Sequence, residues 1–117
     1  MSTYVHWVIE LKIAKDQRAV FQAFADEAVA SARKESGTLG YDWNIADDGE
    51  TVNIYECFKD SEAVLAHMEN FGKLRDRFRT MITPVSFTMY GSPSAEVREA
   101  LASRGVRYFK PIAGFIR

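Results

Sequence analysis

The sequence predicts an α+β fold in which one antiparallel sheet carries its helices on a single face. Segments of strand period and helical period follow the order strand, helix, strand, strand, helix, strand. An Asp-Gly pair within residues 47–50 is a strong hairpin signal between two of those strands. The 117 residues, 47% of them hydrophobic, are typical of a single domain over residues 1–117. We expect its core to cover about 1–91, with a C-terminal extension over about 92–117.

The first strand and helix are predicted from their apolar spacing. Residues 4–13 alternate with period 2, and Trp7 lies on the more apolar face. The apolar side chains of that face are Val5, Trp7, Ile9, Leu11 and Ile13. Asp16 is the predicted N-cap of the following helix, and Ser36-Gly37 supplies the glycine stop after it. The apolar stripe of this helix contains Val20, Phe21, Phe24, Ala28 and Ala32.

The remaining core elements complete the sheet. Residues 38–46 and 51–58 are predicted strands that flank the hairpin turn. A second helix begins after its cap, Asp60, and glycine weakens it near residues 70–72, where we expect a bend. Its apolar face holds Val64, Met68, Phe71, Leu74 and Phe78. Residues 82–90 form the last main strand. This βαββαβ order is the ferredoxin-like arrangement.

The extension is predicted to form a short helix and a tail. Ser92 suits the cap and Pro93 the first helical position, while Arg104-Gly105 is the expected stop. Residues 106–117 are too apolar for a frayed end, so we expect them to dock on their own domain or on a partner.

Bulky apolar residues are predicted on both faces of the sheet. Tyr41 and Trp43 are assigned to the face opposite Ile54 and Phe58, and Phe87 and Met89 to the face opposite Tyr90. The helices cover only one face of this sheet, and a second copy of the chain would cover the other face. The pattern therefore predicts a homodimer.

Composition excludes several classes of function. Fifteen basic and 16 acidic side chains give a formal net charge of −1, which disfavours nucleic acid and anionic membranes as partners. The single cysteine, Cys57, cannot form an internal disulfide, and no apolar run is long enough to span a bilayer. We therefore expect a cytoplasmic protein.

Three segments carry a family resemblance, namely residues 35–41 (ESGTLGY), the pair Tyr55-Glu56, and residues 61–67 (SEAVLAH). Together they resemble the antibiotic biosynthesis monooxygenase family of small dimeric α/β-barrel proteins. The resemblance covers about the first three quarters of the chain. It implies oxidation of a small phenolic or quinol-like aromatic compound with molecular oxygen, with no cofactor and no metal.

Such chemistry needs a base in an apolar, aromatic cavity, because a phenol must lose its proton before its anion can reduce oxygen. His67 is the candidate base, and Glu56 the candidate residue that orients it. The substrate-binding walls are predicted to come from four aromatic residues, namely Trp7, Tyr41, Trp43 and Tyr55.

Structural roles compete at these positions. A lone histidine beside a buried stripe also satisfies a backbone carbonyl, and an arginine across a dimer would neutralise Glu56 equally well. The tryptophans suit a core, His6 suits a strand face at an interface, and Cys57 suits a small buried position. The alternative function is therefore a non-catalytic dimeric domain that binds a small hydrophobic ligand.

Overall fold

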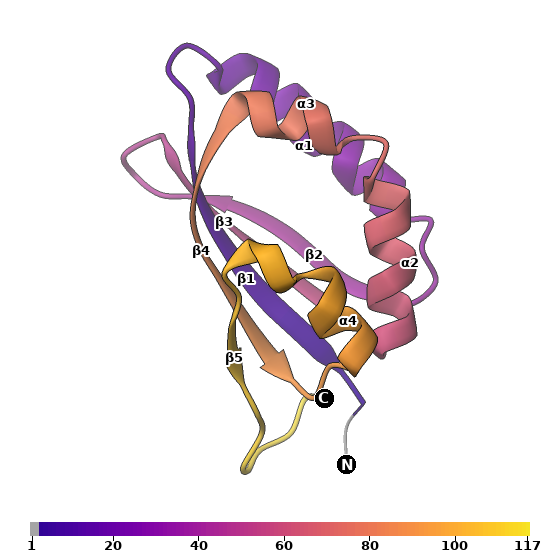
Figure 1. Cartoon of the computed structure of the whole chain (residues 1–117). Coiled ribbons are helices and arrows are strands. Elements are labelled where there is room, and N and C mark those ends of the chain that lie inside the picture. Colours follow the sequence, from indigo (N-terminus) through magenta and orange to yellow (C-terminus); the bar gives the residue numbers. More distant parts are fainter. Residues whose placement is uncertain (1–2) are drawn as a thin grey trace.

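The computed structural model describes residues 3–117, and its elements follow the predicted order (Figure 1). Along the chain they are β1 (Val5–Ile13), α1 (Arg18–Ala32), β2 (Thr38–Ile45), β3 (Thr51–Phe58), α2 (Ser61–Phe71), α3 (Arg75–Met81), β4 (Ile82–Gly91), α4 (Ala95–Ala100), a 3₁₀ turn (Ala102–Arg104) and β5 (Arg107–Phe109). The strands form one open sheet in the spatial order β2-β3-β1-β4-β5. All pairs are antiparallel except β4 with β5. The ferredoxin-like α+β prediction is confirmed.

The sheet has one face covered by helices, and strand register decides which residues lie there. Trp43 pairs with Ile54, and Tyr41 pairs with Glu56, across the β2–β3 ladder. Because directly paired residues share a face, Tyr41 and Trp43 lie on the same side as Ile54. Their predicted assignment to the opposite face is wrong. The open face carries His6, which stacks on Tyr90 at 5.2 Å between ring centroids.

Two helix caps differ from the prediction. Asp16 has a φ of 64° and lies in the turn before the helix, so Gln17 is the N-cap and makes no side-chain cap bond. The cap of α4 is Ser94, whose hydroxyl accepts from the Val97 N–H at 3.2 Å, and Ser92 does not cap it. By contrast, the Asp60 cap is confirmed, since its carboxylate accepts from the Ala63 N–H at 2.9 Å.

The predicted bend in the second helix is a complete break. α2 ends at Phe71 with Gly72 as its C-cap, and α3 starts after Leu74. Phe24, Leu74 and Phe78 belong to one buried cluster. Through this cluster the helices pack on the half of the sheet that contains β2. Val20, predicted within the apolar stripe of α1, is 55% exposed.

The extension folds back over the same face of the sheet as the other helices. Val97 and Leu101 are buried in a second cluster with Trp7 and Phe87, beside α2 (Figure 1). β5 then pairs with β4, so tail docking on its own domain is confirmed there. The rest of the tail is exposed, and Ile112 is 97% exposed. Within residues 3–117 no helix is both long and apolar enough to cross a bilayer.

Candidate active site

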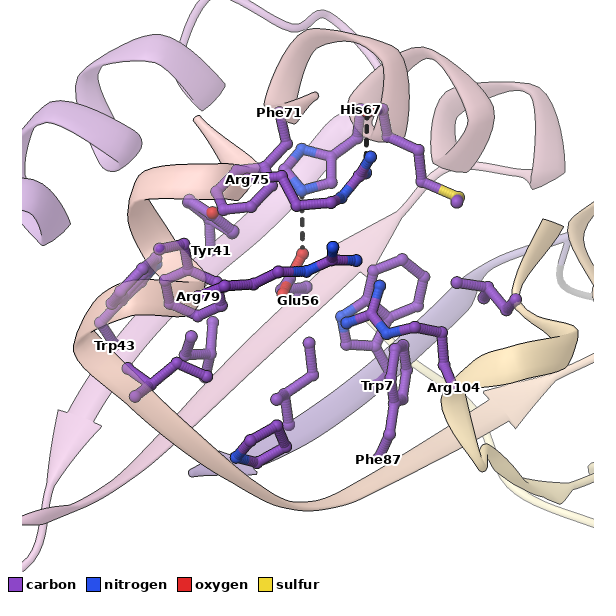
Figure 2. Close-up of a pocket in the computed structure, with 17 residues that line it drawn as sticks. Trp7, Tyr41, Trp43, Glu56, His67, Phe71, Arg75, Arg79, Phe87 and Arg104 are labelled. Carbon is purple, nitrogen blue, oxygen red and sulfur yellow. Dashed lines mark hydrogen bonds and ion pairs between the residues drawn. The ribbon is translucent and has the colours of Figure 1, made fainter. Parts of the chain in front are cut away.

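A cavity of about 130 Å³ lies between the two buried clusters, on the helix-covered face of the sheet. Its walls are mainly aromatic, formed by Trp7, Tyr41, Trp43, Phe71, Phe78 and Phe87. Two buried ionisable side chains, Glu56 and His67, reach it from β3 and α2, and Arg75, Arg79 and Arg104 stand around it (Figure 2). Apolar walls with a few convergent polar groups are typical of a small-molecule site.

His67 lies between two carboxylates. It is on the inner face of α2, one turn after Ala63, whose N–H is fixed by the Asp60 cap. The residue is 6% exposed, with Nδ1 2.8 Å from Glu35 Oε1 and Nε2 3.2 Å from Glu56 Oε1. Glu35 thus holds the ring from the side away from the cavity, and Glu56 meets it from the side of the sheet.

Glu35 is fixed by a polar network at the end of the turn before β2. Its carboxylate accepts from the Thr38 hydroxyl at 2.7 Å and from Asn70 Nδ2 at 2.5 Å, and Asn70 also donates to the Ser31 hydroxyl. Burial alone would raise the pKa of Glu35, but the hydrogen bonds from Thr38, Asn70 and His67 outweigh it and hold this pKa below its ordinary value. Glu35 is therefore a carboxylate at neutral pH.

Glu56 is 3% exposed and has fewer hydrogen-bond partners than Glu35. Although its Oε1 is 3.2 Å from the imidazole, the N–H does not point at it, so this oxygen has no directed hydrogen bond among the described residues. Burial would lower the pKa of His67, but Glu56 and then Glu35 outweigh it, and the pKa lies above its ordinary value. Burial, together with the charge of Glu56, also raises the pKa of Tyr41. The site thus favours an imidazolium beside a carboxylate with a free acceptor.

Glu35 also borders a second, polar cavity of about 420 Å³ on the outer side of the helices. Exposed lysines, Lys34 and Lys73, line it together with Asn70. The Glu35 side chain, 11% exposed, therefore connects His67 Nδ1 with the protein surface.

Three arginines stand at the rim of the aromatic cavity. Arg75 and Arg79 are one turn apart on α3, and Arg104 ends the 3₁₀ turn of the extension. Partial burial and the positive charges of the other two lower the pKa of Arg104. Trp7, 3% exposed, has an indole N–H without a partner among the described residues.

Five of the six predicted site residues line this cavity: Trp7, Tyr41, Trp43, Glu56 and His67. Tyr55 does not. It precedes Glu56 on β3, so side-chain alternation places it on the open face, where its ring is 6.2 Å from His6. Cys57 is buried, as predicted.

Sequence reasoning missed Glu35 and the three arginines. The i, i+4 spacing of Arg75 and Arg79 is a signal that both lie on one helix face. For Glu35 the signal was its place beside Gly37 in the segment that carries the family resemblance. Nothing in the sequence pattern indicates that Arg104 returns to this cavity. Over residues 3–117 no group of three or more His, Cys, Asp or Glu side chains is arranged to hold a metal ion.

Comparison with known proteins agrees with the fold and the sequence resemblance. The family profile described as antibiotic biosynthesis monooxygenase matches residues 4–84, more than half of the chain. No curated protein sequence matches the chain significantly.

Several solved structures share the fold. MupZ from Pseudomonas fluorescens is 20% identical with a TM-score of 0.88, and the match covers 100% of this chain and 91% of MupZ. Rv0793 from Mycobacterium tuberculosis is 22% identical with a TM-score of 0.67, over 74% of this chain and 91% of its own. SnoaB, a cofactor-independent oxygenase from Streptomyces nogalater, is 12% identical with a TM-score of 0.69, and the match covers 80% of this chain and 97% of SnoaB. The fold of the whole chain, extension included, is thus shared with MupZ.

Proposed function

This chain belongs to the antibiotic biosynthesis monooxygenase family, and on that premise we propose that it is a cofactor-independent monooxygenase of a small phenolic or quinol-like compound. The observation that carries the proposal is the buried His67, held between Glu35 and Glu56 at the wall of an aromatic cavity. Catalytic pairs of this kind join a proton acceptor to a group that stabilises the resulting charge.

The geometry suggests how the pair divides the work. Glu56 Oε1 lacks a directed hydrogen bond and is available to accept the phenolic proton. The imidazolium of His67, oriented by Glu35, then stabilises the substrate anion and the superoxide formed when that anion gives an electron to oxygen. This reverses the predicted roles, in which His67 is the base and Glu56 orients it.

The overall reaction balances without an external reductant. The substrate anion and oxygen form a substrate radical and superoxide, which combine into a carbon–oxygen bond. Cleavage of the O–O bond, with loss of the remaining hydrogen on that carbon, gives a quinone-type carbonyl. One oxygen atom enters the product, the other leaves as water, and the substrate supplies all four electrons.

We also propose that the protein works as a cytoplasmic homodimer that uses the open face of the sheet. The support is the partly buried aromatic cluster of His6, Tyr55 and Tyr90 on that face, where the His6 ring stacks on Tyr90 and meets Tyr55 edge-on. Light scattering of the purified protein tests the dimer. A monomer at micromolar concentration would contradict it.

Oxygen uptake tests the proposed activity. The purified protein is assayed with a panel of quinols and single-ring phenols, beside His67→Ala, Glu56→Gln and the surface control Arg77→Gln. We expect uptake that falls by a factor of about 100 or more in both site variants and stays unchanged in the control, since acid–base groups commonly contribute that much. With labelled oxygen gas, one labelled atom should enter each product molecule.

Other outcomes point elsewhere. Turnover without oxygen uptake would show that the pair performs acid–base chemistry of another kind. Ligand binding with no turnover of any panel member would favour the non-catalytic binding domain.

A further inference from the structure

The proposed proton transfer does not use the three arginines at the rim of the cavity. None of them has a carboxylate oxygen within 4 Å among residues 3–117. Arg75 reaches only the Met68 carbonyl at 3.4 Å, and Arg104 lies over the Phe87 ring at 5.7 Å. On the same α3 helix, the outward-facing Arg77 has its partner, Glu27, at 2.7 Å. Arg75, Arg79 and Arg104 therefore have no ion-pair partner within 4 Å in the described part of the chain, and Glu56 acts on Arg104 only from a greater distance.

Their arrangement brings like charges together. Arg75 and Arg79 project from one face of α3, and Arg104 approaches from the extension, so the three side chains extend toward the cavity (Figure 2). Both α3 arginines are close enough to lower the pKa of Arg104 by repulsion. Such a cluster is stabilised when an anion binds between its members, because guanidinium groups form charge-assisted hydrogen bonds with carboxylates and phosphates.

We infer that these arginines hold the anionic head group, a carboxylate or a phosphate, of an amphiphilic aryl substrate. The inference rests on the proposed function, because it names the substrate class of that same site. A cavity of about 130 Å³ is close in size to the roughly 150 Å³ cavity that holds benzene, so it accommodates one aromatic ring. The ring of the substrate therefore fills the aromatic cavity beside Glu56 and His67, and its charged group remains at the rim.

The buried polar atoms of the cavity fit this orientation. The unpartnered Trp7 N–H is a donor for an oxygen on the ring, while Glu56 Oε1 is an acceptor for its hydroxyl proton. A head group next to Glu56 would be repelled, which leaves the arginines as its only favourable position within the described site.

The extension completes the anion site. Arg104 and Leu101 line the cavity from residues beyond position 84, where the family profile match ends. The charge preference is therefore a property of this chain's extension together with α3, and not of the catalytic pair alone.

Calorimetric titration tests the inference with three probes that share one benzene ring: benzoate, phenyl phosphate and the neutral methyl benzoate. We expect at least one anion to bind about tenfold or more tightly than the ester. This is the gain in affinity that one or two charge-assisted hydrogen bonds provide. The tighter anion identifies the head group. Arg104→Gln should remove about tenfold of that affinity and leave ester binding unchanged, whereas Arg77→Gln should change neither. Arg79→Gln provides an independent variant on a different element.

Equal binding of the ester and both anions, or no binding of any probe, would overturn the inference. So would an Arg104→Gln or Arg79→Gln protein that loses ester and anion affinity equally. The titration involves no turnover, so it separates this inference from the oxygenase proposal. Failure of the oxygenase alone leaves the preference for anions, and failure of the anion site alone leaves oxygen uptake with acids and esters oxidised alike.

Discussion

Replacing Glu35 with glutamine removes one charge from the centre of the site and nearly preserves its shape. The new amide oxygen can accept from the Thr38 hydroxyl and from His67 Nδ1, as the carboxylate does. Its NH₂ group would face the NH₂ of Asn70, but rotation of the Asn70 amide by half a turn presents an oxygen instead, and the Ser31 hydroxyl can then donate to Asn70. The cost of Glu35→Gln is therefore mainly electrostatic.

The magnitude follows from two hydrogen bonds, from Thr38 and Asn70, that change from charge-assisted to neutral. A bond to a charged group is worth about 1.5–3 kcal/mol and a neutral one about 1 kcal/mol, so these two changes should lower the free energy of unfolding by roughly 1–4 kcal/mol. Loss of the ion pair between Glu35 and the His67 imidazolium adds to this cost. That is a large part of the stability of a domain of this size, which is about 5–15 kcal/mol.

The pH dependence gives the sharper test. Because the pKa of His67 is raised in the folded protein, its charged interactions stabilise the fold fully below its ordinary pKa of 6.5. That stabilisation is lost as pH rises through the raised value. Because the pKa of Glu35 is lowered in the folded protein, its carboxylate stabilises the fold fully above its ordinary pKa of 4.5. That stabilisation is lost as pH falls through the lowered value. The pair stabilises the fold most between these two ordinary pKa values, so Glu35→Gln should cost most there.

Urea unfolding of both proteins at about pH 5.5 and about pH 9 measures the difference. The loss on Glu35→Gln should be clearly larger at the lower pH, and Glu27→Gln, on the exposed pair with Arg77, should show only a small loss at both. A loss for Glu35→Gln that is equal at both values, or larger at pH 9, would mean that the folded protein holds a neutral imidazole and would refute the electrostatic account.

Three further results are expected. In an NMR titration the two histidines should separate, with the pKa of His67 above and that of His6 below 6.5; a reversed order would contradict the site geometry. Gly37→Ala should destabilise the protein by about 1–3 kcal/mol in thermal unfolding, because a new Cβ would lie 2.5 Å from the Ala63 side chain, and adding Ala63→Gly should restore stability. Asp60→Ala should cost about 1 kcal/mol in urea unfolding through loss of the α2 cap, and an unchanged midpoint would show that the cap contributes nothing.

Most of the fold was predictable because its signals are local. The period of residues 4–13 and the turn at 47–50 depend only on neighbours in sequence, and both elements formed as expected. The caps were harder, because acceptor side chains compete: Asp16 occupies the preceding turn in a left-handed conformation, and Ser94 outcompetes Ser92.

The site was predictable only in part, for the opposite reason. His67 and Glu56 lie on regular elements, so their faces follow from spacing. Glu35 meets His67 across 32 positions of sequence, and that contact depends on how a loop turns toward a helix. Arg104 depends on an extension folding back over the sheet, for which no periodic signal exists. Tyr55 was misplaced because a strand sends adjacent side chains to opposite faces.

The position of Glu35 between two cavities separates the path of the substrate from the path of the proton. Nε2 of His67 faces the aromatic cavity, while Nδ1 meets a carboxylate that borders the polar cavity beside Lys34 and Lys73. Water at that outer surface can exchange protons with the imidazole through Glu35 without entering the aromatic cavity. The imidazolium can thus keep its charge while a ligand still fills the cavity, because its proton supply does not pass through the aromatic cavity.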